Sequence, residues 1–287
     1  MLGLALLVAA APAARAQTPP PNPPWPELLP PAPAPADVQP GPVAGCRKAR
    51  MACIDAVIRR LTATRDRLGC DHRAVFADTY LLLTRQVRAT LRRNPRYFQD
   101  LRWLIYEDVT FANFYFGLFR TGAQLPEAWQ IAFDTAASGD QNAAQDMLLG
   151  INAHVQRDMP YVVASVGIRT PDGRSRKRDH DVMNQILAAA YEPIVRDIER
   201  RYDPFLATSN SSVTPLDDMG GLEMVKGWRE GVWRHAERLL NARNGAERRI
   251  VVQSIETNAA NWARMIAATP GPPGYRAQRD AYCAGGR

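Results

Sequence analysis

A histidine and a carboxylate stand one helical turn apart in residues 146–160, whose sequence is DMLLGINAHVQRDMP. If this run is one helix, each residue advances by about 100°, and His154 and Asp158 project from the same flank. Asn152 then lies on the opposite flank. The apolar stripe between the two flanks consists of Leu148, Ile151, Val155, Met159 and Val162. A histidine and an aspartate at this spacing can share a proton, a hydrogen bond or a metal ion.

A second concentration of polar residues lies at positions 179–184. His180 and Asn184 are again one helical turn apart, and Asp179 and Asp181 flank the histidine. If the two helices are antiparallel neighbours, the two sets of side chains converge. A zinc ion needs three or four ligands at ~2.0–2.3 Å, and the combined sets contain just enough of them.

Two classes of function are open for these residues. In the first, an exported hydrolase uses His154, Asp158 and His180 around a divalent metal such as zinc to activate water on an ester or phosphoester substrate. The residues expected to assist binding are Asn152, Asp179 and Asn184. In the second, the domain binds a small molecule or a partner in a helical pocket, and the same side chains form a structural polar network. The chain contains no G-x-S-x-G, glycine-rich phosphate loop, H-E-x-x-H or C-x-x-C motif that would name another reaction.

Three longer motifs resemble a bacterial family, the domain of unknown function 5995. They are F-A-N-F-Y-F (111–116), P-E-A-W-Q-I-A-F (126–133) and L-L-G-I-N-A-H-V-Q-R-D-M-P (148–160). The hallmark that the resemblance implies is N-A-H-x-x-x-D-[LM]-P. Shorter matches downstream are Asp179 with Asn184, and Arg229 with Trp233 and Ala236. The chain departs from the family by carrying Arg176 and Lys177 where histidines are expected, which weakens a metal site built from that loop. The resemblance covers residues 50–268 and implies a fold and a site location, but no reaction.

The composition is that of an ordinary globular protein. Hydrophobic residues make up 46% of the 287 residues, which is enough for one sizeable core. The net charge is +7, but the 36 basic residues are mixed with 29 acidic ones along the whole chain. A nucleic-acid-binding protein gathers its basic residues on one face. We therefore expect a small-molecule or ester substrate and no nucleic-acid partner.

The N-terminal region has the pattern of an export signal followed by a spacer. An apolar run precedes the small-x-small sequence Ala14-Arg15-Ala16, which predicts a signal peptide over residues 1–16 and a periplasmic or secreted protein. A retained N-terminal anchor is the alternative. Residues 17–44 contain 12 of the 23 prolines, which predicts a disordered, largely extended spacer. No later stretch offers 18 uncharged apolar residues, so we expect no permanent membrane anchor.

Helical periodicity continues through most of residues 45–287. Helices are predicted over residues 47–68, 73–93, 97–119, 127–137, 146–160, 179–202, 222–242 and 246–268. The third is crowded with aromatic residues and should be buried. Pro160 should kink or end the fifth. No window alternates with period two for long enough to indicate a strand, so the sequence predicts a single all-α, bundle-like domain of about eight helices.

The geometry of the first helix limits how the four cysteines pair. If residues 47–68 form one unbroken helix, Cys53 and Cys70 lie roughly 20 Å or more apart, given ~1.5 Å per residue. A disulfide needs Cα atoms within about 7 Å of each other. Two bridges are then possible only as Cys46–Cys53 and Cys70–Cys283. A broken first helix would reopen the other pairings.

Overall fold

The protein is described by a computed structural model, which covers residues 43–206 and 220–286. The expected signal peptide and residues 17–42 of the expected spacer lie outside these residues. The described chain is all-α, as predicted. Its helices are α2 (Met51–Leu68), α3 (Arg73–Arg93), α4 (Leu101–Gly117), α5 (Glu127–Ser138), α6 (Ala143–Asn152), the π-helix η1 (Ala153–Asp158), α7 (Met159–Val166), α8 (Lys177–Tyr202), α9 (Gly220–Asn241), α10 (Gly245–Ala267) and α11 (Tyr275–Gly285).

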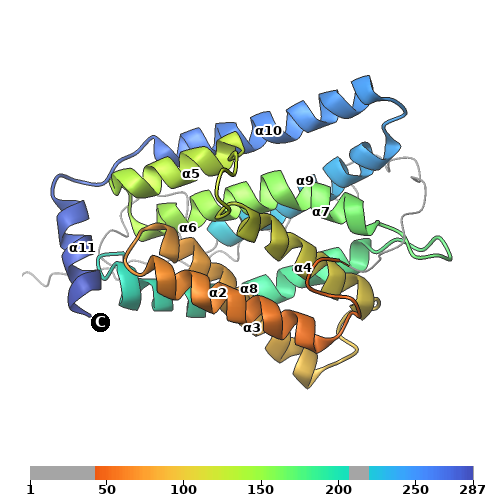
Figure 1. The fold of residues 1–287 in the computed structure, drawn as a ribbon, viewed down its shortest axis with the longest axis horizontal. Helices are drawn as coiled ribbons and strands as arrows, with labels where there is room; N and C mark the ends of the chain where they lie inside the picture. Colours follow the sequence, from red (N-terminus) through yellow and green to blue (C-terminus); the bar gives the residue numbers. More distant parts are fainter. Residues whose placement is uncertain (1–42, 207–219, 287) are drawn as a thin grey trace, which may run out of the picture.

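The helices pack around a central rod formed by α6, η1 and α7 (Figure 1). The helices α5 and α10 lie side by side on one face of the rod. The helices α3 and α4 contact its other face, and α9 packs along η1 and α7. The predicted aromatic helix is α4, and its Trp103, Tyr106 and Tyr115 are fully buried. None of the described helices is long and apolar enough to cross a membrane.

The central rod contains the predicted His–Asp pair, but it is not the single α-helix that we expected. It begins with Asn142, whose side chain forms a capping box with Gln145. Pro160 does not end the helix, which continues to Val166. A proline clashes with the carbonyl group four residues before it and cannot donate to it. The six π-helical residues just before Pro160 widen the turn there, and the N–H group of Met159 bonds to the carbonyl group of His154, five residues back.

The structure differs from the prediction at the start of α4 and in an additional helix, α11. The helix α4 begins at Leu101 rather than at residue 97, because the side chain of Asp100 accepts a hydrogen bond from the N–H group of Trp103 and caps the helix. The helix α11 was not predicted at all. It packs against α8, and its Arg279 is buried in an ion pair with Asp146 at 2.6 Å.

Both predicted disulfides are present. The Cα atoms of Cys46 and Cys53 lie 5.5 Å apart, and those of Cys70 and Cys283 lie 5.8 Å apart. The helix α2 is unbroken, which is the condition under which this pairing was predicted. The second bridge attaches α11 to the loop before α3, so the described C-terminal segment is fixed to the bundle.

Candidate functional site

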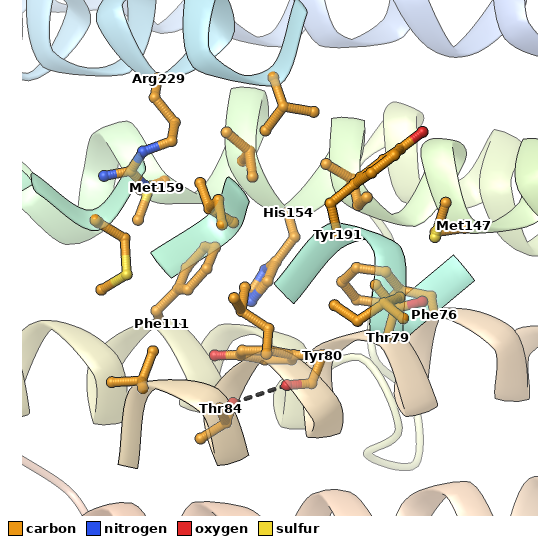
Figure 2. A pocket seen from close by; sticks show the side chains of 18 of the residues that line it. Phe76, Thr79, Tyr80, Thr84, Phe111, Met147, His154, Met159, Tyr191 and Arg229 are labelled. Atoms are coloured by element: carbon orange, nitrogen blue, oxygen red, sulfur yellow. Dashed lines mark hydrogen bonds between the residues drawn. The ribbon is translucent and has the colours of Figure 1, made fainter. Parts of the chain in front are cut away.

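An apolar cavity of about 140 Å³ lies between the central rod and the helices α3, α4, α8 and α9 (Figure 2). Its volume is close to that of an engineered cavity of about 150 Å³ that binds benzene. Four residues of the predicted apolar stripe line it, namely Leu148, Ile151, Val155 and Met159. The stripe therefore faces this cavity as well as side chains of the core.

His154 and Asp158 form a hydrogen-bonded pair at the wall of this cavity. Nδ1 of His154 lies 2.9 Å from Oδ2 of Asp158. The same carboxylate accepts hydrogen bonds from Nε1 of Trp129 at 2.9 Å and from Nη1 of Arg157 at 3.0 Å. A carboxylate only accepts, so Nδ1 carries the imidazole proton and Nε2 carries a lone pair. Nε2 is buried and has no hydrogen-bond partner within the described chain.

Aromatic rings surround the imidazole of His154. Phe111 stacks on it with the ring centroids 3.4 Å apart and the planes 7° apart, and the ring of Tyr80 lies 4.9 Å away (Figure 2). Burial among these rings lowers the pKa of His154 below its ordinary 6.5, although the Asp158 carboxylate opposes this effect. The imidazole is therefore neutral at neutral pH, and its Nε2 is a hydrogen-bond acceptor and a base.

Three further polar atoms around the cavity are buried without a partner in the described structure. They are the hydroxyl group of Tyr80, Oε1 of Glu107 and Oδ2 of Asp108. Burial raises the pKa of Glu107 to about 7 and that of Asp108 to about 7. It also raises the pKa of the Tyr80 phenol well above 10. These residues were not predicted from the sequence, although two adjacent acidic residues inside the helix richest in aromatic residues could have indicated them.

The second predicted set of residues lies in a different polar group, centred on Arg229. Nε2 of His180 donates to the carbonyl oxygen of Arg229 at 2.9 Å. The guanidinium of Arg229 donates in turn to the carbonyl oxygen of His180 at 2.5 Å and to Oδ1 of Asn184 at 2.9 Å. Nδ1 of His180 is 4.0 Å from Oε1 of Glu107. Burial and the neighbouring Arg229 keep the pKa of His180 well below 6.5.

Asp179 stabilises a turn of the chain far away in sequence rather than capping its own helix. Its two carboxylate oxygens accept hydrogen bonds from the backbone N–H groups of Gln99 at 2.9 Å and of Asp100 at 2.7 Å. Arg176, at the other side of this turn, is buried and bonds to Asp100 at 3.0 Å. The residues 176–179 therefore fix the start of α4, which carries Glu107 and Asp108 to the cavity.

Asn152 belongs to a third network, between the central rod and α10. Its Nδ2 donates to the carbonyl oxygen of Ala259 at 2.9 Å, and its Oδ1 accepts from Nε2 of Gln156 at 2.7 Å. Oε1 of Gln156 accepts from Nδ2 of Asn258 at 2.7 Å. This chain of hydrogen bonds gives both the amide nitrogen and the amide oxygen of Asn152 a partner and holds α10 against η1.

His154, Asp158 and His180 do not come together as one zinc-binding group. Within residues 43–206 and 220–286, no group of three or more His, Cys, Asp or Glu side chains is placed to hold a metal ion. The reason is that the side chains bond to different helices. Asp158 accepts a hydrogen bond from Trp129 of α5, whereas His180 donates one to the carbonyl oxygen of Arg229 in α9. Of the expected cluster, only His154 lines the cavity, and Asp158 lies behind it as its hydrogen-bond partner.

Residues 54–269 match the model of a protein family described as a family of unknown function (DUF5995). This match covers well over half of the chain, so the chain belongs to that family, as the motifs had indicated. No curated protein and no solved structure was found to match the chain.

Proposed function

We propose that this member of a family of unknown function binds an uncharged, mainly apolar small molecule inside its cavity, through a hydrogen bond to His154. The observation that carries the proposal is the buried lone pair on Nε2 of His154, which has no partner within the described chain. Leaving a buried acceptor unsatisfied costs about 1–3 kcal/mol. A ligand with an N–H or O–H group that reaches Nε2 removes this cost while its apolar body fills the cavity.

The wall of the cavity supports an uncharged ligand. Glu107 and Asp108 would repel an anion at neutral pH wherever they are ionised, and the low dielectric of the surroundings would strengthen that repulsion. The guanidinium of Arg229, which also lines the cavity, already donates hydrogen bonds to His180 and Asn184. The aromatic rings of Phe76, Tyr80 and Phe111 offer flat apolar contacts. A planar ring system with one hydrogen-bond donor matches these features.

The two function classes that the sequence left open are supported unequally. A metal-dependent hydrolase needs His154, Asp158 and His180 around one or two metal ions, whereas His154 bonds to Asp158 and His180 bonds to the backbone of Arg229. A ligand-binding helical domain needs a cavity with few polar groups, and the cavity beside His154 has this character. We therefore favour the ligand-binding class of function, and we assign the His154–Asp158 pair to the binding site.

Indole and indene provide a direct test, because they share one shape and only indole carries an N–H donor. We expect calorimetry at pH 7.5 to show indole binding about tenfold more tightly than indene, which is the effect of one net hydrogen bond. The variant His154→Phe should lose this preference. Val155→Phe, which fills the cavity, should bind neither compound, whereas Ile250→Phe, at a site that is 63% exposed, should bind both. Binding that is unaffected by Val155→Phe would contradict the proposal.

We also propose that the chain is exported to the periplasm or secreted, with residues 1–16 removed and residues 17–44 acting as a spacer. The two disulfides support this, because such bridges form and persist outside the reducing cytoplasm. N-terminal sequencing of the exported product is expected to start at Gln17 or within a few residues of it. A full-length product that stays in the cytoplasm would contradict the proposal.

A further inference from the structure

We propose that the cavity is a proton-transfer site, in which His154 acts as a general base on the bound molecule itself. The proposal rests on the ligand-binding function proposed above and adds a reaction to it. The substrate class is an apolar carbonyl compound with an acidic C–H group next to the carbonyl. The pair of His154 and Asp158, the apolar surroundings and the hydroxyl group of Tyr80 each supply one part of this chemistry.

The first part is a base with a fixed orientation. Asp158 holds the proton of His154 on Nδ1 through the 2.9 Å contact and leaves Nε2 as the basic atom. Trp129 and Arg157 fix the Asp158 carboxylate in turn. Asp158 is thus a positioning residue, and His154 is the group that touches the ligand. The π-helical turn carries both side chains, and such turns are frequent at functional sites.

The second part is the exclusion of competing nucleophiles. Thr79 and Thr84 line the cavity, and a histidine base can activate a threonine hydroxyl group as a nucleophile. Thr79 donates to the carbonyl oxygen of Val75 at 2.9 Å, and Thr84 donates to that of Tyr80 at 2.8 Å (Figure 2). Both hydroxyl protons are therefore committed to the backbone of α3. This leaves the proton on the ligand as the one that His154 removes.

The third part is a donor for the negative charge that develops on the ligand. The Tyr80 hydroxyl is buried, has no partner in the described chain and stays protonated, and its ring lies 4.9 Å from that of His154. In the step, the proton of the C–H group moves to Nε2 and the C–H electron pair forms a C=C bond. The carbonyl π pair moves to oxygen, which accepts a hydrogen bond from Tyr80. In a substrate with a double bond between its β and γ carbons, the proton then returns from Nε2 to the γ carbon, the double bond moves to the α and β carbons and the carbonyl group re-forms. This completes an isomerisation, and no oxidant or reductant is needed.

The probe 5-nitrobenzisoxazole tests the base, because its fused ring system has the size of indole and it reacts by loss of one C–H proton. The base removes that proton while the N–O bond breaks, and the product is a coloured nitrophenolate. We expect the full chain to accelerate this reaction by about 10²-fold or more over the same concentration of imidazole. His154→Gln should remove the acceleration, and Tyr80→Phe should reduce it about tenfold. His235→Gln makes the same change outside the cavity and should leave the rate as it is.

The pH dependence of the rate separates a working base from a structural histidine. With the intact chain, the rate should rise with pH, pass its midpoint below 6.5 and then stay constant, because neutral His154 is the active form. A midpoint near 7 would instead identify the carboxyl group of Glu107 or Asp108 as the base, so the profile is informative even where His154→Gln does not fold. Indole binding without acceleration, or acceleration that persists in a folded His154→Gln variant, would overturn the proton-transfer proposal and leave the binding function standing. Failure to bind indole would instead overturn the binding function.

Discussion

Nδ1 of His154 and Oδ2 of Asp158 lie 2.9 Å apart within one π-helical turn, and this contact decides which nitrogen of the imidazole carries the lone pair. The carboxylate can only accept, so the lone pair of the imidazole is on Nε2. The first prediction is that Asp158→Asn reverses this arrangement. With its amide nitrogen in the place of Oδ2, the introduced Asn side chain gives up the hydrogen bond from Trp129 and donates to Nδ1, and the imidazole proton then moves to Nε2.

In Asp158→Asn, the preference for indole over indene should therefore disappear while the shape of the cavity is kept. Calorimetry with the two compounds measures the preference, and nitrogen NMR of the imidazole measures which nitrogen carries the proton. The matched control is Asp172→Asn, on the exposed loop before α8, and it should keep the preference. A preference that survives Asp158→Asn would show that Asp158 does not set the tautomer.

Gly150 is where α6 comes close to Phe76 of α3. A Cβ atom at position 150 would lie 2.2 Å from Cγ of Phe76, which is far inside van der Waals contact. We predict that Gly150→Ala pushes the Phe76 ring toward the cavity that it lines, lowers the free energy of unfolding by about 1–3 kcal/mol and weakens indole binding. Gly227→Ala in α9 is the control, because nothing lies within 4 Å of its Cβ position.

The control should gain stability, since alanine is favoured over glycine inside a helix by about 0.5–1 kcal/mol. Urea unfolding of both variants tests the contrast. Equal stability of the two variants would mean that Phe76 moves aside without strain.

Most of the helices, and the contacts between residues close together in the chain, could be predicted from the sequence. The spacing of His154 and Asp158 predicted their contact, and the length of α2 predicted which cysteines pair, because both relations depend on one helix alone. The π-helical turn was not predicted, since apolar periodicity does not distinguish a wide turn from an α-helical one. Pro160 was the local sign of it, and we interpreted that residue as a kink or a helix end instead.

Relations between distant helices were the part that the sequence did not determine. The partners of Asp179 are backbone N–H groups at residues 99 and 100, and nothing in its own neighbourhood indicates them. His180 likewise pairs with Arg229 rather than with His154, because the packing of α8 against α9 sets its direction. The suitable residue types on two helices therefore predicted one shared cluster, whereas the fold places His154 and His180 in separate polar groups.

The contribution of Glu107 to the stability of the bundle should fall as the pH rises through the acidic range. Burial raises its pKa from 4.5 to about 7, so the folded state holds a proton that the unfolded state releases. This contribution is fully present below about 4.5 and is lost as the pH rises to about 7. We predict that Glu107→Gln flattens this dependence and stabilises the protein above pH 7 by up to roughly 3 kcal/mol.

Urea unfolding at several pH values between 4 and 8 measures this effect. Asp108, whose pKa is also raised to about 7, should leave part of the slope in place when only Glu107 is changed. Glu192→Gln, at a side chain that is 65% exposed, is the control and should keep the full slope. Parallel pH profiles for the parent chain and Glu107→Gln would contradict the prediction.

The two disulfides should differ in what they contribute, because they close loops of very different length. The Cys70–Cys283 bridge spans a sequence separation of 213, and the Cys46–Cys53 bridge spans 7. The loss of chain entropy in the unfolded state then stabilises the protein by about 5 kcal/mol for the first bridge and about 2 kcal/mol for the second.

We predict that replacing Cys70 and Cys283 by serine lowers the melting temperature more than replacing Cys46 and Cys53, and that it exposes α11 to proteolysis. The ion pair of Arg279 with Asp146 remains in that variant and should keep part of α11 in place. A larger effect from the short bridge would show that local packing at the start of α2, rather than chain entropy, sets the contribution of each bridge.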